Sequence, residues 1–226
     1  MKIFGPFKQL IPMDSLPAKG PIEELSVLSN AGVIVEGEKI VQTGSYEVLR
    51  KSYPNAKEDH SGKDMVVLPG FIDAHTHLCW YGDRALDYAD RLAGKSYLEI
   101  AARGGGIWSS VLRTREASRE ELASITSMRA SRHFTDGVTT IEVKSGYGLD
   151  VSSECKILEA ISMAHGQSVP DLLPTCLAAH MKPHDFDGSN MDYLNMLINE
   201  LLPEIKRKGL SNRVDMFIEK SAFTTN

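Results

Sequence analysis

The sequence predicts an α/β fold, made of a small β-rich lobe over residues 1–65 and half of a parallel (β/α) barrel over residues 66–226. After residue 66, apolar strand-like runs alternate with helical patterns, which is typical of βαβ units. Polar residues follow each apolar run, as in barrels whose chemistry takes place at the carboxyl ends of the strands. A complete eight-stranded barrel takes about 250 residues, so this 226-residue chain has room for only about four βα units after the lobe.

The N-terminal lobe is predicted from one hairpin. Two β-rich runs, Val33–Val35 and Ile40–Thr43, flank Gly37, and this pattern is typical of antiparallel strands joined by a tight turn. The polar segment 61–64 then separates the lobe from the barrel.

The barrel elements follow in order. The predicted strands are Val66–Leu78, Val138–Val143, Leu172–Ala179 and Val214–Ile218. Ser118 and Glu121 form a capping-box pattern at the start of one helix, which we expect to end at Asp136. Ser152 or Ser153 begins the next helix, and Ser189 or Asn190 begins the third, in which Pro203 should mark a break or a restart.

Composition restricts the function classes. The net charge of −5 and the pI of about 5.8 argue against nucleic acid or an anionic membrane as partner, because phosphate binding needs a basic face. The sequence has no apolar run near the ~20 residues of a membrane span and no leading signal pattern. Cys79, Cys155 and Cys176 lie in apolar contexts without a pairing pattern, which fits reduced thiols. We therefore expect a cytoplasmic protein that acts on a small molecule.

The first barrel strand ends in a candidate metal site. Residues two apart on a strand face the same side, so His75 and His77 should present parallel imidazoles. Neutral imidazoles suit Zn²⁺ or Fe²⁺ better than Mg²⁺ or Ca²⁺, which prefer oxygen ligands. The four remaining partnerless histidines, in contrast, are expected to be ordinary: His60, His133, His165 and His184.

These motifs also carry a family resemblance. The segment PGFIDAHTHL at residues 69–78 resembles the first barrel strand of the amidohydrolase superfamily, which are metal-dependent hydrolases. Three further segments, 82–118, 137–150 with its KSGYGLD, and Ala178–His180, resemble the imidazolonepropionase family. The resemblance implies a TIM barrel beside a β-sandwich, of which the first lobe would be a part.

The resemblance also implies an activity. A metal-activated water would open the ring of 4-imidazolone-5-propanoate to N-formimino-L-glutamate, in histidine degradation. His75 and His77 would be metal ligands for one Zn or Fe ion. The family's remaining ligands, a histidine after the fifth strand and an aspartate after the eighth, have no counterpart in this sequence.

Four residues match substrate-binding positions of the family. Arg84 would bind the propanoate carboxylate, a pairing that suits the guanidinium fork. Tyr147, between two glycines, and Tyr97 would contact the substrate. His180 would be the catalytic histidine that polarises the reacting carbonyl. Lys144 follows the second strand and is not expected to be a metal-bridging carboxylated lysine, which normally follows the fourth.

Two other functions stay open on the sequence. One is another mononuclear amidohydrolase of the deaminase type, although KSGYGLD and the position of Arg84 argue against it. The other is a truncated fragment without catalysis, since two ligands alone hold a metal weakly. Half a barrel also leaves sheet edges open, so we expect a homo-oligomer or pairing with a second half.

Overall fold

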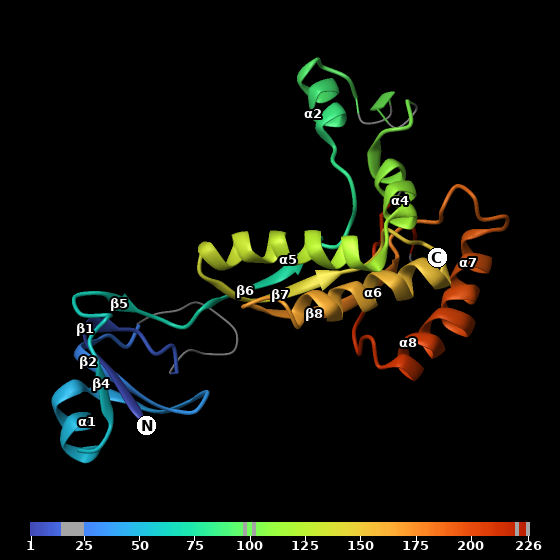
Figure 1. The fold of residues 1–226 in the computed structure, drawn as a ribbon. Coiled ribbons are helices and arrows are strands. Elements are labelled where there is room, and N and C mark those ends of the chain that lie inside the picture. Colours follow the sequence, from blue (N-terminus) through green and yellow to red (C-terminus); the bar gives the residue numbers. More distant parts are fainter. Residues whose placement is uncertain (15–24, 97–98, 101–102, 220–221, 225–226) are drawn as a thin grey trace. The chain divides into compact units, whose positions relative to one another are not determined.

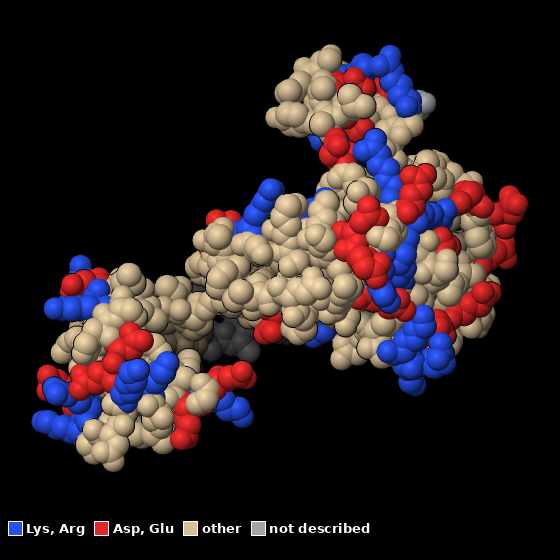
Figure 2. Space-filling view, in the orientation of Figure 1, with Lys and Arg blue, Asp and Glu red and all other residues tan. Residues whose placement is uncertain are grey.

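The computed structural model describes residues 1–14, 25–96, 99–100, 103–219 and 222–224. Two compact units divide the chain, at Met1–Gly70 and Phe71–Asn226. None of the helices in these described ranges has the length and hydropathy needed to cross a membrane. Figure 2 shows basic and acidic side chains interspersed over the visible face of each unit.

The first unit is a β-rich lobe. Its five-stranded sheet has the order β3-β2-β1-β4, and β5 also pairs with β1. The elements are β1 (Lys2–Leu10), β2 (Leu28–Glu36), β3 (Lys39–Ser45), α1 (Tyr46–Ser52), β4 (Lys57–Asp59) and β5 (Val66–Val67). The predicted hairpin is confirmed, because β2 and β3 pair antiparallel with Glu36 opposite Lys39. Tyr46 and Leu49 of α1 bury their side chains against Ile3 and Ile34 of the sheet.

The second unit is a curled parallel half-barrel, with strand order β6-β7-β8-β9. Its elements are β6 (Phe71–Thr76), α2 (Ala85–Leu92), α4 (Gly106–Glu116), α5 (Arg119–Thr135), β7 (Val138–Lys144), α6 (Val151–His165), β8 (Asp171–Ala179), α7 (Asn190–Met196), the π-helical η1 (Leu197–Leu201), α8 (Leu202–Lys208) and β9 (Val214–Met216). Figure 1 shows α5 and α6 running along the strands, whereas α2 stands away from the sheet. The predicted α/β half-barrel after a β-rich lobe is confirmed.

The core of this unit lies between the strands and the helices. Ile141 and Val143 of β7 are fully buried and belong to one apolar cluster with Leu122 of α5 and Ile157 of α6. Because side chains alternate along a strand, the residues between them face the opposite side of the sheet. That side carries polar groups, including Glu142 and Lys144, and it holds the candidate site.

The helix starts follow capping chemistry. Ser118 and Glu121 form the predicted capping box, and Ser189 forms a second one with Asp192. For α6 the predicted start at Ser152 or Ser153 was wrong by two or three residues, since Asp150 is the N-cap and its carboxylate accepts the Ser153 N–H at 2.7 Å. An aspartate caps as well as a serine does, so the sequence pattern does not separate these candidates.

The predicted strand Val66–Leu78 is divided in the structure. Val66 and Val67 pair with β1 of the lobe, whereas β6 begins at Phe71 and pairs with β7. Between them lies the segment containing Pro69, which has no N–H to donate to a sheet. The apolar run does not show which sheet each half joins, and Val66, Phe71 and Ile72 on either side of the break are exposed.

Candidate active site

The two predicted metal ligands lie at the carboxyl end of β6. Their imidazole rings are neighbours, with centroids 5.5 Å apart. His75 is exposed and His77 is half-buried. The Asp73 carboxylate accepts the backbone N–H of His75 at 3.3 Å and lies 3.5 Å from His133 Nδ1. His133 therefore has a partner, contrary to the expectation from the sequence. The same holds for His60, which lies 3.3 Å from Glu58, and for His165, whose Nδ1 accepts the Leu172 N–H at 3.0 Å.

The His77 ring has the properties of a metal donor. Burial lowers its pKa to about 4, with His180 and His75 adding to the effect, so the ring is neutral at physiological pH. Its Nδ1 atom is buried and has no hydrogen-bond partner among the residues that the structure describes, whereas such an atom usually has one. These observations fit two imidazole donors for a divalent ion. The described residues contain no group of three or more His, Cys, Asp or Glu side chains arranged to hold a metal.

His77 opens onto a cavity of about 420 Å³. Arg84, Tyr147 and His180 line the same cavity, although they lie in three different segments of the chain. Its other lining residues are Gly105, Ile107, Trp108, Met181, His184, Phe217 and Ala222. The structure thus brings together four residues that the sequence analysis singled out separately.

His180 follows β8 and has a defined orientation. Its Nδ1 lies 3.0 Å from the Gly146 carbonyl oxygen, which can only accept, so the proton is on Nδ1. Burial lowers the pKa of His180, although Gly146 and Asp215 oppose the shift. In this neutral ring, Nε2 is a hydrogen-bond acceptor.

Tyr147 packs edge-on against both cavity histidines. Its ring centroid lies 5.8 Å from that of His77 and 5.7 Å from that of His180, with interplanar angles above 80°. Burial raises the pKa of Tyr147, while Arg84 and Arg129 lower it in part. The phenol therefore stays protonated at neutral pH and can donate or accept a hydrogen bond.

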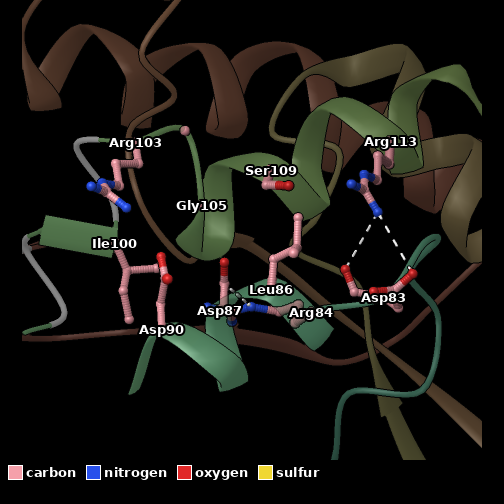
Figure 3. Close-up of a pocket in the computed structure, with 11 residues that line it drawn as sticks. Asp83, Arg84, Leu86, Asp87, Asp90, Ile100, Arg103, Gly105, Ser109 and Arg113 are labelled. Atoms are coloured by element: carbon pink, nitrogen blue, oxygen red, sulfur yellow. Dashed lines mark hydrogen bonds and ion pairs between the residues drawn. The ribbon is translucent and has the colours of Figure 1, made fainter. Parts of the chain in front are cut away.

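Arg84 lies immediately before α2, between two cavities. Its Nε donates to Asp87 Oδ2 at 2.7 Å, and Asp87 also accepts the Gly106 N–H at the start of α4. Figure 3 shows this arrangement in a second cavity of about 370 Å³, where Arg113 contacts Asp83. Asp87 accepts the hydrogen bond of Nε and so fixes the orientation of the guanidinium group, while the two terminal nitrogens stay available within the part of the chain that the structure describes.

The cavity wall also contains a ring pair that was not predicted from the sequence. Trp108 of α4 stacks on His184 with ring centroids 4.7 Å apart, and the Arg115 guanidinium lies 5.5 Å from the Trp108 ring. His184, expected to be ordinary, is thus part of the wall. The two rings are far apart in sequence and share no motif, so no local signal indicates their contact.

Lys144 forms an ion-pair cluster on the same side of the sheet. Its ammonium group lies 2.7 Å from a carboxylate oxygen of Glu142 and 2.7 Å from one of Asp215. Desolvation lowers the pKa of Lys144, but the hydrogen bonds to Asp215 and Glu142 outweigh it and raise the pKa overall. Tyr97, predicted to contact the substrate, lies outside the described residues.

Comparison with solved structures identifies the class of fold. The atrazine chlorohydrolase TrzN from Arthrobacter aurescens TC1, solved with zinc, matches with a TM-score of 0.56 at 16% identity, over 96% of this chain and 46% of that one. Guanine deaminase from E. coli matches with a TM-score of 0.55 at 15% identity, over 88% and 43%. The second unit with its β-rich lobe therefore has the amidohydrolase fold.

Sequence comparison identifies the family within this class of fold. The imidazolonepropionase of Bdellovibrio bacteriovorus is 42% identical over 203 residues, which are 89% of this chain and 47% of that protein. Those of Myxococcus xanthus (46%, over 71% and 38%) and Caldanaerobacter subterraneus (36%, over 98% and 52%) also match. The chain spans about half the length of these relatives and fits the N-terminal portion of imidazolonepropionase, so the resemblance is confirmed. No protein-family model matches the chain.

Proposed function

We propose that this chain supplies the first metal ligands and the substrate-binding wall of an imidazolonepropionase-type hydrolase. The reaction would open the ring of 4-imidazolone-5-propanoate to N-formimino-L-glutamate. The observation that carries the proposal is the shared cavity of His77, Arg84, Tyr147 and His180. Their side chains offer a cation, neutral imidazoles and a phenol around a volume suited to a small anionic ring compound.

His75 and His77 would hold one zinc or iron ion. When bound, a divalent ion lowers the pKa of water to about 7 and so provides a nucleophile for an amide carbon. Two imidazoles leave further coordination positions to be filled. We infer that these come from a second half-barrel or a second copy, which would also cover the edge strands β6 and β9. Ile72 and Val214 are exposed there by 71% and 63%.

The substrate would be oriented by the other cavity residues. Arg84, held by Asp87 at Nε, would direct its terminal nitrogens to the propanoate carboxylate. His180 Nε2, an acceptor in the neutral ring, would bind a ring N–H of the imidazolone. The family's carbonyl-polarising role requires a donor at Nε2, and only the protonated ring has one while Nδ1 bonds Gly146. Tyr147 would contact the ring.

The first test is metal binding. The chain would be passed through gel filtration with light scattering after exposure to Zn²⁺, and its zinc content and mass measured. We expect zinc in the wild-type chain, loss of zinc in His75→Ala and His77→Ala, and no change in His60→Ala, whose ring lies in the first unit. Equal zinc in all four proteins would refute the ligand assignment. A mass above that of one chain would support pairing of half-barrels. A monomer that binds a full equivalent of zinc would contradict it.

The second test separates binding from turnover. Imidazole-4-propanoate, a stable compound with the propanoate side chain of the substrate on an imidazole ring in place of the imidazolone, would be titrated calorimetrically. Arg84→Gln should weaken binding about 10- to 100-fold, because a charge-assisted hydrogen bond contributes roughly 1.5–3 kcal/mol. Arg91→Gln on the exposed side of α2 should not. Loss of the absorbance of 4-imidazolone-5-propanoate tests hydrolysis, and binding without hydrolysis would favour a non-catalytic chain.

We also infer a cytoplasmic location, which fractionation of cells would test.

A further inference from the structure

The loop that carries Tyr147 is built around one buried carboxylate. Glu154 lies in the first turn of α6 and is fully buried. Its Oε1 accepts the backbone N–H groups of Gly148 and Leu149, each at 2.8 Å. The N–H of Gly146 lies 3.1 Å from Oε2 and 3.2 Å from Oε1. Three amides on both sides of Tyr147 therefore converge on a single side chain.

The loop conformation depends on this convergence. Gly146 has a φ of +101° and Leu149 a φ of +58°, and a leucine adopts the left-handed region only where its surroundings impose it. Gly148 packs so closely on α6 that an added Cβ would lie 2.6 Å from the Glu154 nitrogen. Buried N–H groups need acceptors, and the Glu154 carboxylate provides them for this turn.

The same loop also orients a residue from the next strand. The carbonyl oxygen of Gly146 accepts the hydrogen bond from His180 Nδ1. That bond fixes the His180 tautomer and turns Nε2 away from the loop. The position of Gly146 thus determines the orientation of His180, just as the loop determines that of Tyr147.

We propose that Glu154 is a positioning residue for the cavity. It holds Tyr147 and His180 in their binding orientation through the loop backbone, and it touches neither of their side chains nor the ligand. This inference rests on the proposed function, in which these two residues contact a substrate. A purely structural Glu154 would affect the stability of α6 but not the conformation of the loop in the folded chain.

The test compares two glutamates of the same helix. In Glu154→Gln, an amide that donates hydrogen bonds replaces part of the acceptor, whereas Glu159→Gln changes an exposed ion pair with Lys208. We expect Glu154→Gln to speed the hydrogen exchange of the Gly146, Gly148 and Leu149 amides at least 10-fold, measured by NMR, and to shift the Tyr147 ring signals. Glu159→Gln should change these rates less than twofold, in chains that both remain folded.

Ligand binding completes the test. Glu154→Gln should weaken imidazole-4-propanoate binding at least 10-fold in the wild-type background, and by less in a Tyr147→Ala background, because coupled residues are not additive. Unchanged loop exchange and unchanged affinity in a folded Glu154→Gln chain would overturn the proposal.

A second variant guards against misfolding. Gly148→Ala keeps the Glu154 carboxyl group, but its Cβ would lie 2.6 Å from the Glu154 nitrogen and so forces the loop and the start of α6 apart. It should therefore reproduce both the faster exchange and the weaker binding. Wild-type affinity in Gly148→Ala would overturn the proposal. If the wild-type chain itself does not bind imidazole-4-propanoate, the proposed function fails. Exchange and ring shifts then still decide whether Glu154 positions the loop.

Discussion

Replacing Lys144 by methionine should cost the second unit a large part of its stability. The Lys144 side chain is 4% exposed, and its partner Glu142 is 15% exposed. Within the described part of the chain, Glu142 Oε2 already lacks a hydrogen-bond partner, so Lys144→Met leaves a buried carboxylate without its cation. Removing one member of a buried pair costs about 3–5 kcal/mol. The second partner, Asp215, is 42% exposed, so its share is small, about 1 kcal/mol or less.

Urea unfolding followed by tryptophan fluorescence measures this effect in the right unit. Both tryptophans, Trp80 and Trp108, lie after residue 70, so the signal reports the half-barrel. With a slope of about 2 kcal/mol per molar urea, the loss corresponds to a midpoint lower by about 1.5–2.5 M. A protein domain has only about 5–15 kcal/mol in total, so the change is easily measured.

Lys208→Met is the matched control. Lys208 also contacts two carboxylates, Glu159 at 2.9 Å and Glu204 at 3.5 Å, but its side chain is 35% exposed. Its loss should cost less than about 1 kcal/mol. Adding Glu142→Gln to Lys144→Met should restore part of the stability, because the unpaired charge is removed. Equal midpoints for the two lysine variants, or no recovery in the double variant, would refute the reasoning.

Two further predictions follow from pKa shifts. The hydrogen bond from Lys144 lowers the pKa of Asp215, against the opposing effect of desolvation. The ionised Asp215 therefore stabilises the folded chain fully above its unfolded-state pKa of about 3.9. This stabilisation is lost as the pH falls through the lower folded-state pKa. Urea midpoints measured down this range should fall less steeply for Asp215→Asn than for the wild-type chain, and Asp187→Asn, an exposed control, should behave as wild type. Burial raises the thiol pKa of Cys79 and Cys176 to about 12 and also raises that of Cys155, so Ellman's reagent at pH 8 should react only after denaturation; rapid labelling of the native chain would contradict their burial.

Much of the half-barrel could be predicted because its central strands, β7 and β8, are apolar and buried on the helix-covered face. The apolar runs beginning at Val138, Leu172 and Val214 coincide with β7, β8 and β9 to within two residues at each end. The same argument failed at Val66, where one apolar run serves two sheets. Helices α2 and α4 were not predicted, and α2 buries none of its side chains. A hydrophobic pattern therefore locates these strands well, but it shows neither the pairing partner nor the burial of the edge strands, where Ile72 and Val214 stay exposed.

In the site, too, local patterns could be predicted from the sequence and long-range contacts could not. The neighbouring rings of His75 and His77 follow from the two-residue period of one strand, so a local pattern predicts them. Their neighbours depend on contacts that no period encodes, as the Trp108–His184 stack illustrates. Glu154 is the clearest case. A glutamate in the first turn of a helix usually faces solvent and favours the helix dipole, and nothing in its immediate sequence indicates burial.

The burial of Glu154 is decided by the glycines before it. Gly146 takes up a left-handed conformation and Gly148 allows the chain to pass against α6, so the loop folds back over the start of its own helix. The carboxylate is then enclosed by the backbone amides from which it accepts hydrogen bonds. Gly146, Gly148 and Leu149 thus form one structural unit with Glu154, at sequence separations of eight or less. The glycines allow the close approach, and the glutamate provides the acceptor. In the proposed function, the role of the KSGYGLD motif is therefore twofold: Tyr147 contacts the ligand, and the glycines together with Glu154 hold Tyr147 in place.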